Sequence, residues 1–268
     1  MSKIIALGGG EIGRPKENGG YYPVETIQID KEIIRLSGKK QPLLLFIPTA
    51  SGDSNSYYEV IKRHFGRRLK CKCDVLYLIN TKFTKAEIRQ KIMKADIIYV
   101  GGGNTLNMLN VWKRKGVDKI LNAAYKKGII LSGLSAGAIC WFKYGLSDSR
   151  PKLGKDNYGY IRIKALGFVP LLLSPHHITE KARKLALIKV MKKTRDVGVA
   201  LDDCSALEIV NGNYRIVRSK GSAHAYKVYF YKKVLHYEKI INSSRFRSLK
   251  ELTNANGFES SRSRTLRT

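Results

Sequence analysis

The chain has 268 residues, enough for one large α/β domain with a substantial core or for two small domains at most. Its charge is strongly unbalanced, because 50 Lys and Arg stand against 21 Asp and Glu, for a formal net charge of +29. No stretch approaches the roughly 18 consecutive apolar residues of a membrane span, and the first apolar run is too short for a signal peptide. We therefore expect a cytoplasmic protein with no membrane partner.

The excess of positive charge has two interpretations. One is attraction to polyanions such as nucleic acid, and the other is Lys and Arg spread over solvated faces. The basic residues are scattered along the whole chain, with no tight block interleaved with aromatics and no common nucleic-acid-binding motif. The second interpretation is favoured, and nucleic acid is expected as a partner only through non-specific charge.

The four cysteines do not have the spacing of a metal site. Cys71 and Cys73 are separated by one residue, where zinc knuckles have two, and no His or Cys pair follows that would complete a site. Four free thiols fit a reducing cytosol. We expect neither a metal nor a cofactor.

In the first half of the chain, short apolar runs alternate with amphipathic stretches, the pattern of strands separated by helices. Strands are predicted over residues 4–7, 43–47, 75–79, 97–100 and 129–131. Helices are predicted over residues 30–36, 57–68, 85–94, 106–115 and 117–127. Continuous apolar strands bounded by helices indicate a mostly parallel sheet with helices on both faces.

The pattern changes after residue 160. Short strands with turn signals such as Asn211-Gly212 are predicted over residues 199–201, 206–210, 214–217 and 225–230. From about Asn242 the chain becomes polar and rich in Ser and Arg. We therefore predict a single α/β domain over residues 1–243 and a basic, largely disordered tail over residues 244–268.

One segment matches the nucleophile-elbow pattern G-x-S-x-G: Gly133-Leu134-Ser135-Ala136-Gly137. An apolar strand precedes it, and an apolar stretch over residues 136–142 that can start a helix follows it. A serine on such a tight turn needs small neighbours, and the next amide then lies at a helix N-terminus, where it can hold an oxyanion. The alternative is a glycine turn with a capping serine.

A general base for Ser135 is available in His176 and His177, which lie between an apolar run, residues 168–173, and a helical stretch, residues 179–191. Ligand sites of parallel sheets form at the carboxyl ends of the strands, so a histidine after a strand can meet the serine there. The alternative is a surface histidine pair that precedes a helix.

The catalytic arrangement also calls for an acid that fixes the imidazole tautomer and stabilises the imidazolium. Asp148 lies between the serine and the histidines, whereas Asp202, Asp203 and Glu208 follow the strand over residues 199–201. Position along the chain leaves all four open.

A second glycine-rich segment, Gly101-Gly102-Gly103-Asn104-Thr105, follows the strand over residues 97–100. Leu106 stands where a dinucleotide-binding fingerprint has its last glycine, and a P-loop lysine is missing. An oxyanion-hole role is therefore favoured over phosphate binding. A turn with no ligand is the remaining alternative.

Several segments together resemble one family, the serine peptidases that include peptidase E (aspartyl dipeptidase) and cyanophycinase. The matching segments, spread in order over residues 3–220, are Phe46-Ile47-Pro48-Thr49-Ala50-Ser51, Ile98–Thr105, Gly133–Ala138, Leu166-Gly167-Phe168 and Ser174-Pro175-His176. The resemblance implies an α/β, flavodoxin-like (class I glutamine amidotransferase-like) fold, with a serine where amidotransferases place a cysteine.

The resemblance also implies catalytic roles. Ser135 would attack the scissile carbonyl, and His176 would take its proton and later protonate the leaving amine. The oxyanion would be held by the amides of Gly102, Gly103 and Ala136. Asp148 is the preferred acidic member.

The peptidase E members cleave dipeptides with N-terminal aspartate and read the aspartate with a basic residue, for which Arg183 is the candidate here. Asn104 is assigned to substrate binding. The resemblance thus implies a small peptide as substrate, and we expect a monomer or a homodimer. The alternatives are a cyanophycinase-like β-aspartyl hydrolase, a polyanion-binding protein on the same scaffold, and an α/β-hydrolase esterase, which normally has an HGGG-type segment that is absent here.

Overall fold

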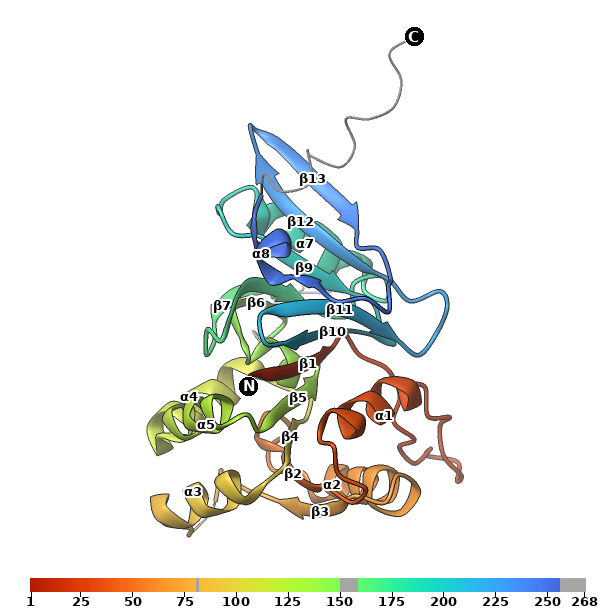
Figure 1. Cartoon of the computed structure of the whole chain (residues 1–268), viewed down its shortest axis with the longest axis vertical. Helices are drawn as coiled ribbons and strands as arrows, with labels where there is room; N and C mark the ends of the chain where they lie inside the picture. Colours follow the sequence, from red (N-terminus) through yellow and green to blue (C-terminus); the bar gives the residue numbers. More distant parts are fainter. Residues whose placement is uncertain (81, 150–158, 256–268) are drawn as a thin grey trace.

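The computed structural model describes residues 1–80, 82–149 and 159–255. These residues form two β-sheets surrounded by helices, an α/β fold as predicted (Figure 1). In the part of the chain that is described, no helix has both the length and the apolar character to cross a membrane.

The first sheet has eight strands in the order β14-β11-β10-β1-β5-β4-β2-β3. Five adjacent strands are parallel to one another: β1 (Lys3–Leu7), β5 (Ile130–Leu134), β4 (Ile97–Val100), β2 (Leu43–Ile47) and β3 (Lys72–Val75). The antiparallel strands are β10 (Ser205–Val210), β11 (Asn213–Arg218) and β14 (Arg247–Ser248).

Helices cover both faces of the parallel strands, which explains why β1, β2 and β4 are almost wholly apolar. Alternate residues of β1, β2, β4 and β5 pack against α1 (Ile27–Leu36), α2 (Asn55–Ile61) and the π-helical continuation η2 (Lys62–Arg68). The intervening residues of the same strands point to the other face of the sheet and pack against α3 (Lys85–Lys94), α4 (Thr105–Lys115) and α5 (Val117–Lys127).

The second sheet has the order β13-β12-β9-β8-β6-β7. Its strands are β6 (Phe142–Ser147), β7 (Ile161–Lys164), β8 (Val169–Ser174), β9 (Gly198–Leu201), β12 (Ala225–Tyr231) and β13 (Val234–Lys239). The adjacent strands β6, β8 and β9 are parallel, and α7 (Lys181–Met191) packs on this sheet. The short helix α6 (Ala136–Ile139) leads from β5 of the first sheet into β6 of the second.

Two predicted elements differ from the structure. The strand predicted over residues 75–79 ends at Val75, because the amides of Leu78 and Ile79 donate to a carboxylate oxygen of Asp53, 2.6 Å away in each case, instead of to a neighbouring strand. The apolar stretch predicted to start a helix at residue 136 does so for only four residues, and Phe142 begins β6. A short apolar run cannot separate a buried helix from a buried strand.

The prediction that disorder begins at residue 244 is wrong for residues 244–255. Arg247 and Ser248 form β14, and α8 (Leu249–Thr253) buries Leu252 completely. The buried ammonium of Lys227 donates to the carbonyl oxygens of Glu251 and Asn254, at 3.1 and 2.6 Å. Leu252 and Lys227 thus anchor a segment whose composition is mostly polar. The rest of the predicted tail, residues 256–268, lies outside the described residues.

Candidate active site

Ser135 occupies a strained turn between β5 and α6, with φ 55° and ψ −113°. Its flanking glycines are required by close backbone contacts, since a Cβ on Gly133 or Gly137 would lie 2.5 or 2.1 Å from the carbonyl oxygen of Val100 in β4. A non-glycine residue in such a conformation costs about 1–3 kcal/mol, and this strain is typical of a nucleophile elbow. The tight turn with small flanking residues that the sequence motif predicts is therefore found around Ser135.

The imidazole of His176 faces this serine, as expected from the sequence. Its Nε2 lies 2.9 Å from the Ser135 hydroxyl oxygen, and its backbone amide donates to the carbonyl of Gly8 at 3.1 Å. The neighbouring His177 is buried on the other side of the turn, where it contacts the rings of Tyr226 and Tyr237. Of the two histidines, only His176 is positioned to act on the serine.

The acid that contacts His176 is Asp203, not Asp148. Nδ1 of His176 lies 2.6 Å from one carboxylate oxygen of Asp203, and the other oxygen accepts a 2.6 Å hydrogen bond from Thr179. Asp148 instead lies 3.6 Å from the guanidinium of Arg183. The preference for Asp148 is therefore wrong. The histidine follows β8, which lies between β6 and β9 in the sheet. Asp148 follows β6 on one side and Asp203 follows β9 on the other, and it is the acid after β9 that contacts the histidine.

The other two acidic candidates also have different partners. The Asp202 carboxylate accepts from the backbone amide of His224 at 2.9 Å. Glu208 lies inside β10, where it is fully buried and forms a 2.6 Å ion pair with Arg215.

Asp203 remains ionised at neutral pH. Burial raises the pKa of its carboxyl group, but the hydrogen bonds from His176 and Thr179 outweigh that effect, so the pKa is lowered overall. A carboxylate held ionised beside Nδ1 can stabilise a proton taken up at Nε2.

Gly9, in the loop after β1, packs closely against both His176 and Asp203. A Cβ on Gly9 would lie 2.0 Å from Oδ1 of Asp203 and 2.5 Å from Nδ1 of His176, so no side chain fits there. The carbonyl of Gly9 also accepts from the amide of Cys204 at 2.9 Å. No role is predicted from the sequence for this segment, Gly8-Gly9-Gly10, although it too follows a parallel strand.

The Gly101–Gly103 turn lies beside the serine. A Cβ on Gly102 would be 3.5 Å from Cβ of Ser135, and the Gly102 amide donates to the hydroxyl of Tyr57 at 3.3 Å. Gly103 has a positive φ of 135° and packs on the carbonyl of Ala50, which a Cβ would approach to 2.1 Å. Ala136 is the first residue of α6, so no earlier turn of that helix supplies a carbonyl to accept a hydrogen bond from its amide.

The two residues predicted to bind substrate are engaged elsewhere. The side-chain oxygen of Asn104 caps α4 by accepting from the amide of Asn107 at 2.9 Å, and its nitrogen donates to Ser149. Arg183 is buried and donates to Glu180 and to the carbonyl of Leu146, at 2.8 and 3.0 Å. Both side chains thus have partners within the fold, and neither lines the cavity beside His176 that is described next.

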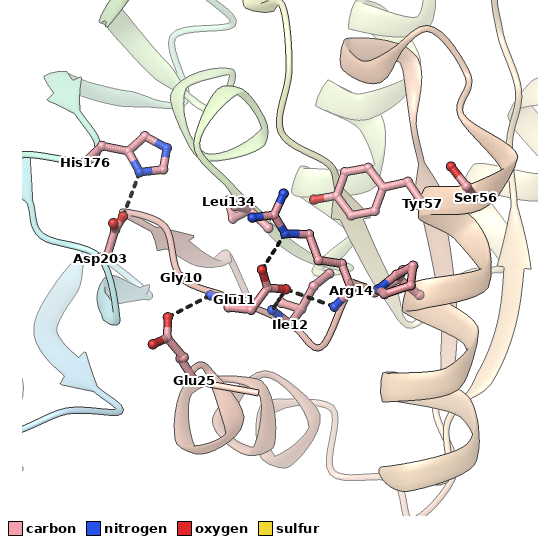
Figure 2. A pocket seen from close by; sticks show the side chains of 12 residues that line it. Gly10, Glu11, Ile12, Arg14, Glu25, Ser56, Tyr57, Leu134, His176 and Asp203 are labelled. Atoms are coloured by element: carbon pink, nitrogen blue, oxygen red, sulfur yellow. Dashed lines mark hydrogen bonds and ion pairs between the residues drawn. The ribbon is translucent and has the colours of Figure 1, made fainter. Parts of the chain in front are cut away.

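A cavity of about 650 Å³ opens beside the histidine. Its walls come from the loop after β1, from α2 and from the ends of β5, β8 and β9. The lining residues are Gly10, Glu11, Ile12, Arg14, Pro15, Glu25, Ser56, Tyr57, Val60, Leu134, His176 and Asp203 (Figure 2). Within residues 1–80, 82–149 and 159–255, no group of His, Cys, Asp and Glu side chains is arranged to hold a metal ion.

Arg14 supplies a cation to this cavity. Its Nε donates to Glu11 at 2.6 Å, and the same carboxylate accepts from the amides of Ile12, Gly13 and Arg14 at 2.9–3.0 Å. Figure 2 shows the guanidinium between Leu134 and Tyr57, pointing into the cavity. Glu11 therefore holds the arginine through Nε and leaves its two terminal nitrogens directed into the cavity that His176 and Asp203 also line.

The fold and the site together define an α/β protein that carries a Ser–His–Asp hydrogen-bonded chain at the carboxyl ends of its parallel strands. The sequence model of peptidase family S51 matches residues 18–217, and the chain belongs to that family of peptidases.

Relatives and solved structures agree with this membership. An uncharacterized peptidase, YgaJ, of Bacillus subtilis is 37% identical over 230 residues, which are 85% of this chain and 92% of the relative. Peptidase E of Citrobacter koseri is 27% identical over 133 residues, 49% of this chain and 56% of that protein. The crystal structure of a peptidase from an acI-B1 actinobacterium has the same fold, with a TM-score of 0.67, 17% identity and coverage of 92% of this chain and 97% of that one.

Proposed function

We propose that this peptidase is of the serine type, with Ser135 as nucleophile, His176 as general base and Asp203 as the residue that orients and stabilises the imidazole. The observation that carries the proposal is the continuous chain from the Ser135 hydroxyl to Nε2 of His176, 2.9 Å, and from Nδ1 to Asp203, 2.6 Å. Both distances are within hydrogen-bond reach, as nucleophilic catalysis requires.

The geometry implies the order of proton transfers. As the Ser135 oxygen attacks the carbonyl carbon, Nε2 of His176 takes the hydroxyl proton, and Asp203 stabilises the resulting imidazolium. When the tetrahedral intermediate collapses, the same proton passes to the leaving amine and the C–N bond breaks, which leaves an ester on Ser135. Water then attacks the ester while His176 takes its proton, and the acid product leaves as the serine hydroxyl is restored.

We further propose that the substrates are dipeptides with N-terminal aspartate. The relative that is a peptidase E supports this class, and Arg14 offers a guanidinium to a carboxylate in the cavity. Arg14 thereby takes the role that the sequence resemblance suggested for Arg183. Hydrolysis of β-linked aspartyl peptides is the alternative, since the same cation can meet either carboxylate of the aspartate. The four free cysteines support a reducing, cytoplasmic location.

The test combines a serine-directed probe with a substrate panel. A fluorophosphonate should label Ser135, as mapped by peptide mass spectrometry, and Ser135→Ala should lose both the label and the hydrolysis of aspartyl p-nitroanilide. Comparing α-Asp-Arg with β-Asp-Arg separates the two substrate classes. Turnover by Ser135→Ala at the wild-type rate would refute the serine mechanism.

A further inference from the structure

The hydroxyl of Tyr57 lies in the candidate active site and has no part in the mechanism above. Its ring is fixed on α2, because a Cβ on Gly101 would come within 2.9 Å of it and the ring of Phe46 packs edge-on at a centroid distance of 5.0 Å. The side chain lines the cavity that also contains His176 and Leu134. Rigid packing of this kind is what a preorganised catalytic group needs.

The hydroxyl is positioned by the turn that is expected to hold the oxyanion. The Tyr57 oxygen accepts the amide proton of Gly102 at 3.3 Å, and Gly102 itself lies against Ser135. Figure 2 shows the hydroxyl directed toward the guanidinium of Arg14 and, beyond it, toward Leu134, the residue before the serine. The phenol oxygen therefore uses one lone pair to accept from the Gly102 amide, and this hydrogen bond fixes the position of the hydroxyl in the cavity.

The proton of this hydroxyl is not used inside the protein. Over the described ranges, no acceptor takes a hydrogen bond from the Tyr57 O–H, whereas the hydroxyl of the next residue, Tyr58, donates to the carbonyl of Cys73 at 3.2 Å. Burial raises the pKa of Tyr57 to about 12, so the group keeps its proton at neutral pH. An oriented hydroxyl with an unused proton therefore lies in the wall of the cavity that His176 and Leu134 also line.

Building on the proposed serine mechanism, we propose that the Tyr57 hydroxyl donates a hydrogen bond to the substrate carbonyl oxygen as that oxygen becomes negative. The Gly102 amide then acts through the tyrosine: by donating to the phenol oxygen, it orients the hydroxyl and polarises its O–H bond. The Ala136 amide is the second donor. Tyr57 is thus a catalytic residue, and Gly102 is a positioning residue.

The experiment compares Tyr57→Phe with Tyr58→Phe, which lies next on the same helix and outside the cavity lining. Both variants keep the ring and lose only the hydroxyl. Aspartyl p-nitroanilide gives kcat and KM, and an aspartyl trifluoromethyl ketone, which forms a tetrahedral oxyanion adduct on a serine, gives the affinity for a transition-state mimic. Thermal unfolding checks that both variants fold.

Tyr57→Phe should lower kcat by about 100-fold with little change in KM, the usual scale for one oxyanion donor. Its affinity for the ketone should fall by a similar factor, and Tyr58→Phe should match the wild type in both assays. Unchanged or higher kcat in Tyr57→Phe, or a change confined to KM, would overturn the role of Tyr57. If Ser135→Ala is inactive in the same assay, such a result leaves the serine mechanism intact, whereas an active Ser135→Ala contradicts both proposals.

A second measurement covers the case in which Tyr57→Phe does not fold. Tyr57→3,5-difluorotyrosine keeps the shape and the hydroxyl but makes the phenol more acidic. The alkaline limb of the kcat profile should then move to lower pH, because the donor loses its proton earlier. An alkaline limb in the same place as that of the wild type would contradict the proposal.

Discussion

Nδ1 of His176 lies 2.6 Å from a carboxylate oxygen of Asp203, although 27 residues separate the two in the chain. The histidine follows β8 and the aspartate follows β9, and these are adjacent parallel strands of the second sheet. Ser135 comes from the end of β5 in the first sheet. The site is therefore assembled where the carboxyl ends of strands from both sheets meet.

Asp203→Asn should lower kcat for aspartyl p-nitroanilide by about 10³- to 10⁴-fold, because an amide cannot stabilise the imidazolium and favours the wrong tautomer. Asp148→Asn is the matched control. Its carboxylate is mostly exposed and, among the described residues, pairs with Arg183 alone, so kcat should stay within about twofold of the wild type, since exposed ion pairs contribute little. A severe loss in Asp148→Asn with a mild one in Asp203→Asn would reverse the assignment.

Gly9→Ala should abolish hydrolysis, because the new methyl group would lie 2.0 Å from Oδ1 of Asp203 and push the acid away from the histidine. Its backbone, at φ 157°, is also in a conformation that residues with a side chain rarely adopt, so the clash and the backbone conformation both oppose the alanine. Gly221→Ala is the control, as a Cβ there meets no atom within 4 Å and the backbone needs no positive φ. Steady-state kinetics and urea unfolding of both variants separate lost activity from lost stability.

Much of the fold follows from local patterns in the sequence. The strands predicted over residues 43–47 and 97–100 and the helices over 85–94 and 117–127 have the observed boundaries, because each is a single apolar run or a regular amphipathic repeat. β6 and β7 were missed. Phe142–Ser147 mixes exposed and buried positions and begins within an apolar stretch that also suits a helix.

Only the parts of the site that lie in recognisable backbone motifs, Ser135 and His176, could be predicted from the sequence. Ser135 and His176 each follow an apolar strand, so their meeting at one edge could be expected. The acid could not be chosen, because Asp148 and Asp203 both follow strands that flank β8, and the choice depends on Gly9 and on the contact with Thr179 across the fold. Arg14 lies in an irregular loop with no motif to mark it.

Arg14→Gln should lower kcat/KM for aspartyl p-nitroanilide by about 10- to 100-fold, the range expected for losing a charged hydrogen bond. Turnover of alanyl p-nitroanilide, which has no side-chain carboxylate, should change much less. Arg35→Gln is a close control: Arg35 forms the same i,i+3 pair with a glutamate, Glu32, and is as exposed, with 62% of its side chain accessible against 65% for Arg14. Equal losses on both substrates would show that Arg14 does not select for aspartate.

Leu252→Ala should destabilise the protein by about 2–5 kcal/mol, since the side chain is fully buried at the end of the chain that the sequence predicted to be disordered. The variant should keep the wild-type kcat under folding conditions, because α8 takes no part in the site. Leu185→Ala, whose side chain is exposed on α7, should cost much less. Urea unfolding measures both, and equal midpoints for wild type and Leu252→Ala would contradict the packing of α8.

The stability of the protein should fall between pH 6.5 and pH 4 in a way that depends on His177. Burial lowers the pKa of this histidine to about 4 in the folded protein, from an ordinary value of 6.5. Between those values the unfolded chain binds a proton that the folded protein does not, so the free energy of unfolding decreases as the pH falls. The full effect is about 3 kcal/mol and is reached below pH 4.

His177→Phe removes this titration while keeping an aromatic ring between Tyr226 and Tyr237. The variant loses the hydrogen bond to the Tyr237 hydroxyl, so its stability at pH 7.5 serves as its own reference. Relative to that reference, the variant should lose less stability than the wild type on going to pH 4, as measured by urea unfolding at a series of pH values. Acidic groups such as Asp203 contribute to both proteins alike, so only the difference between the two slopes reports on His177. Parallel slopes would mean that the imidazole is as easily protonated in the folded protein as in the unfolded chain, and that its burial does not oppose the charge.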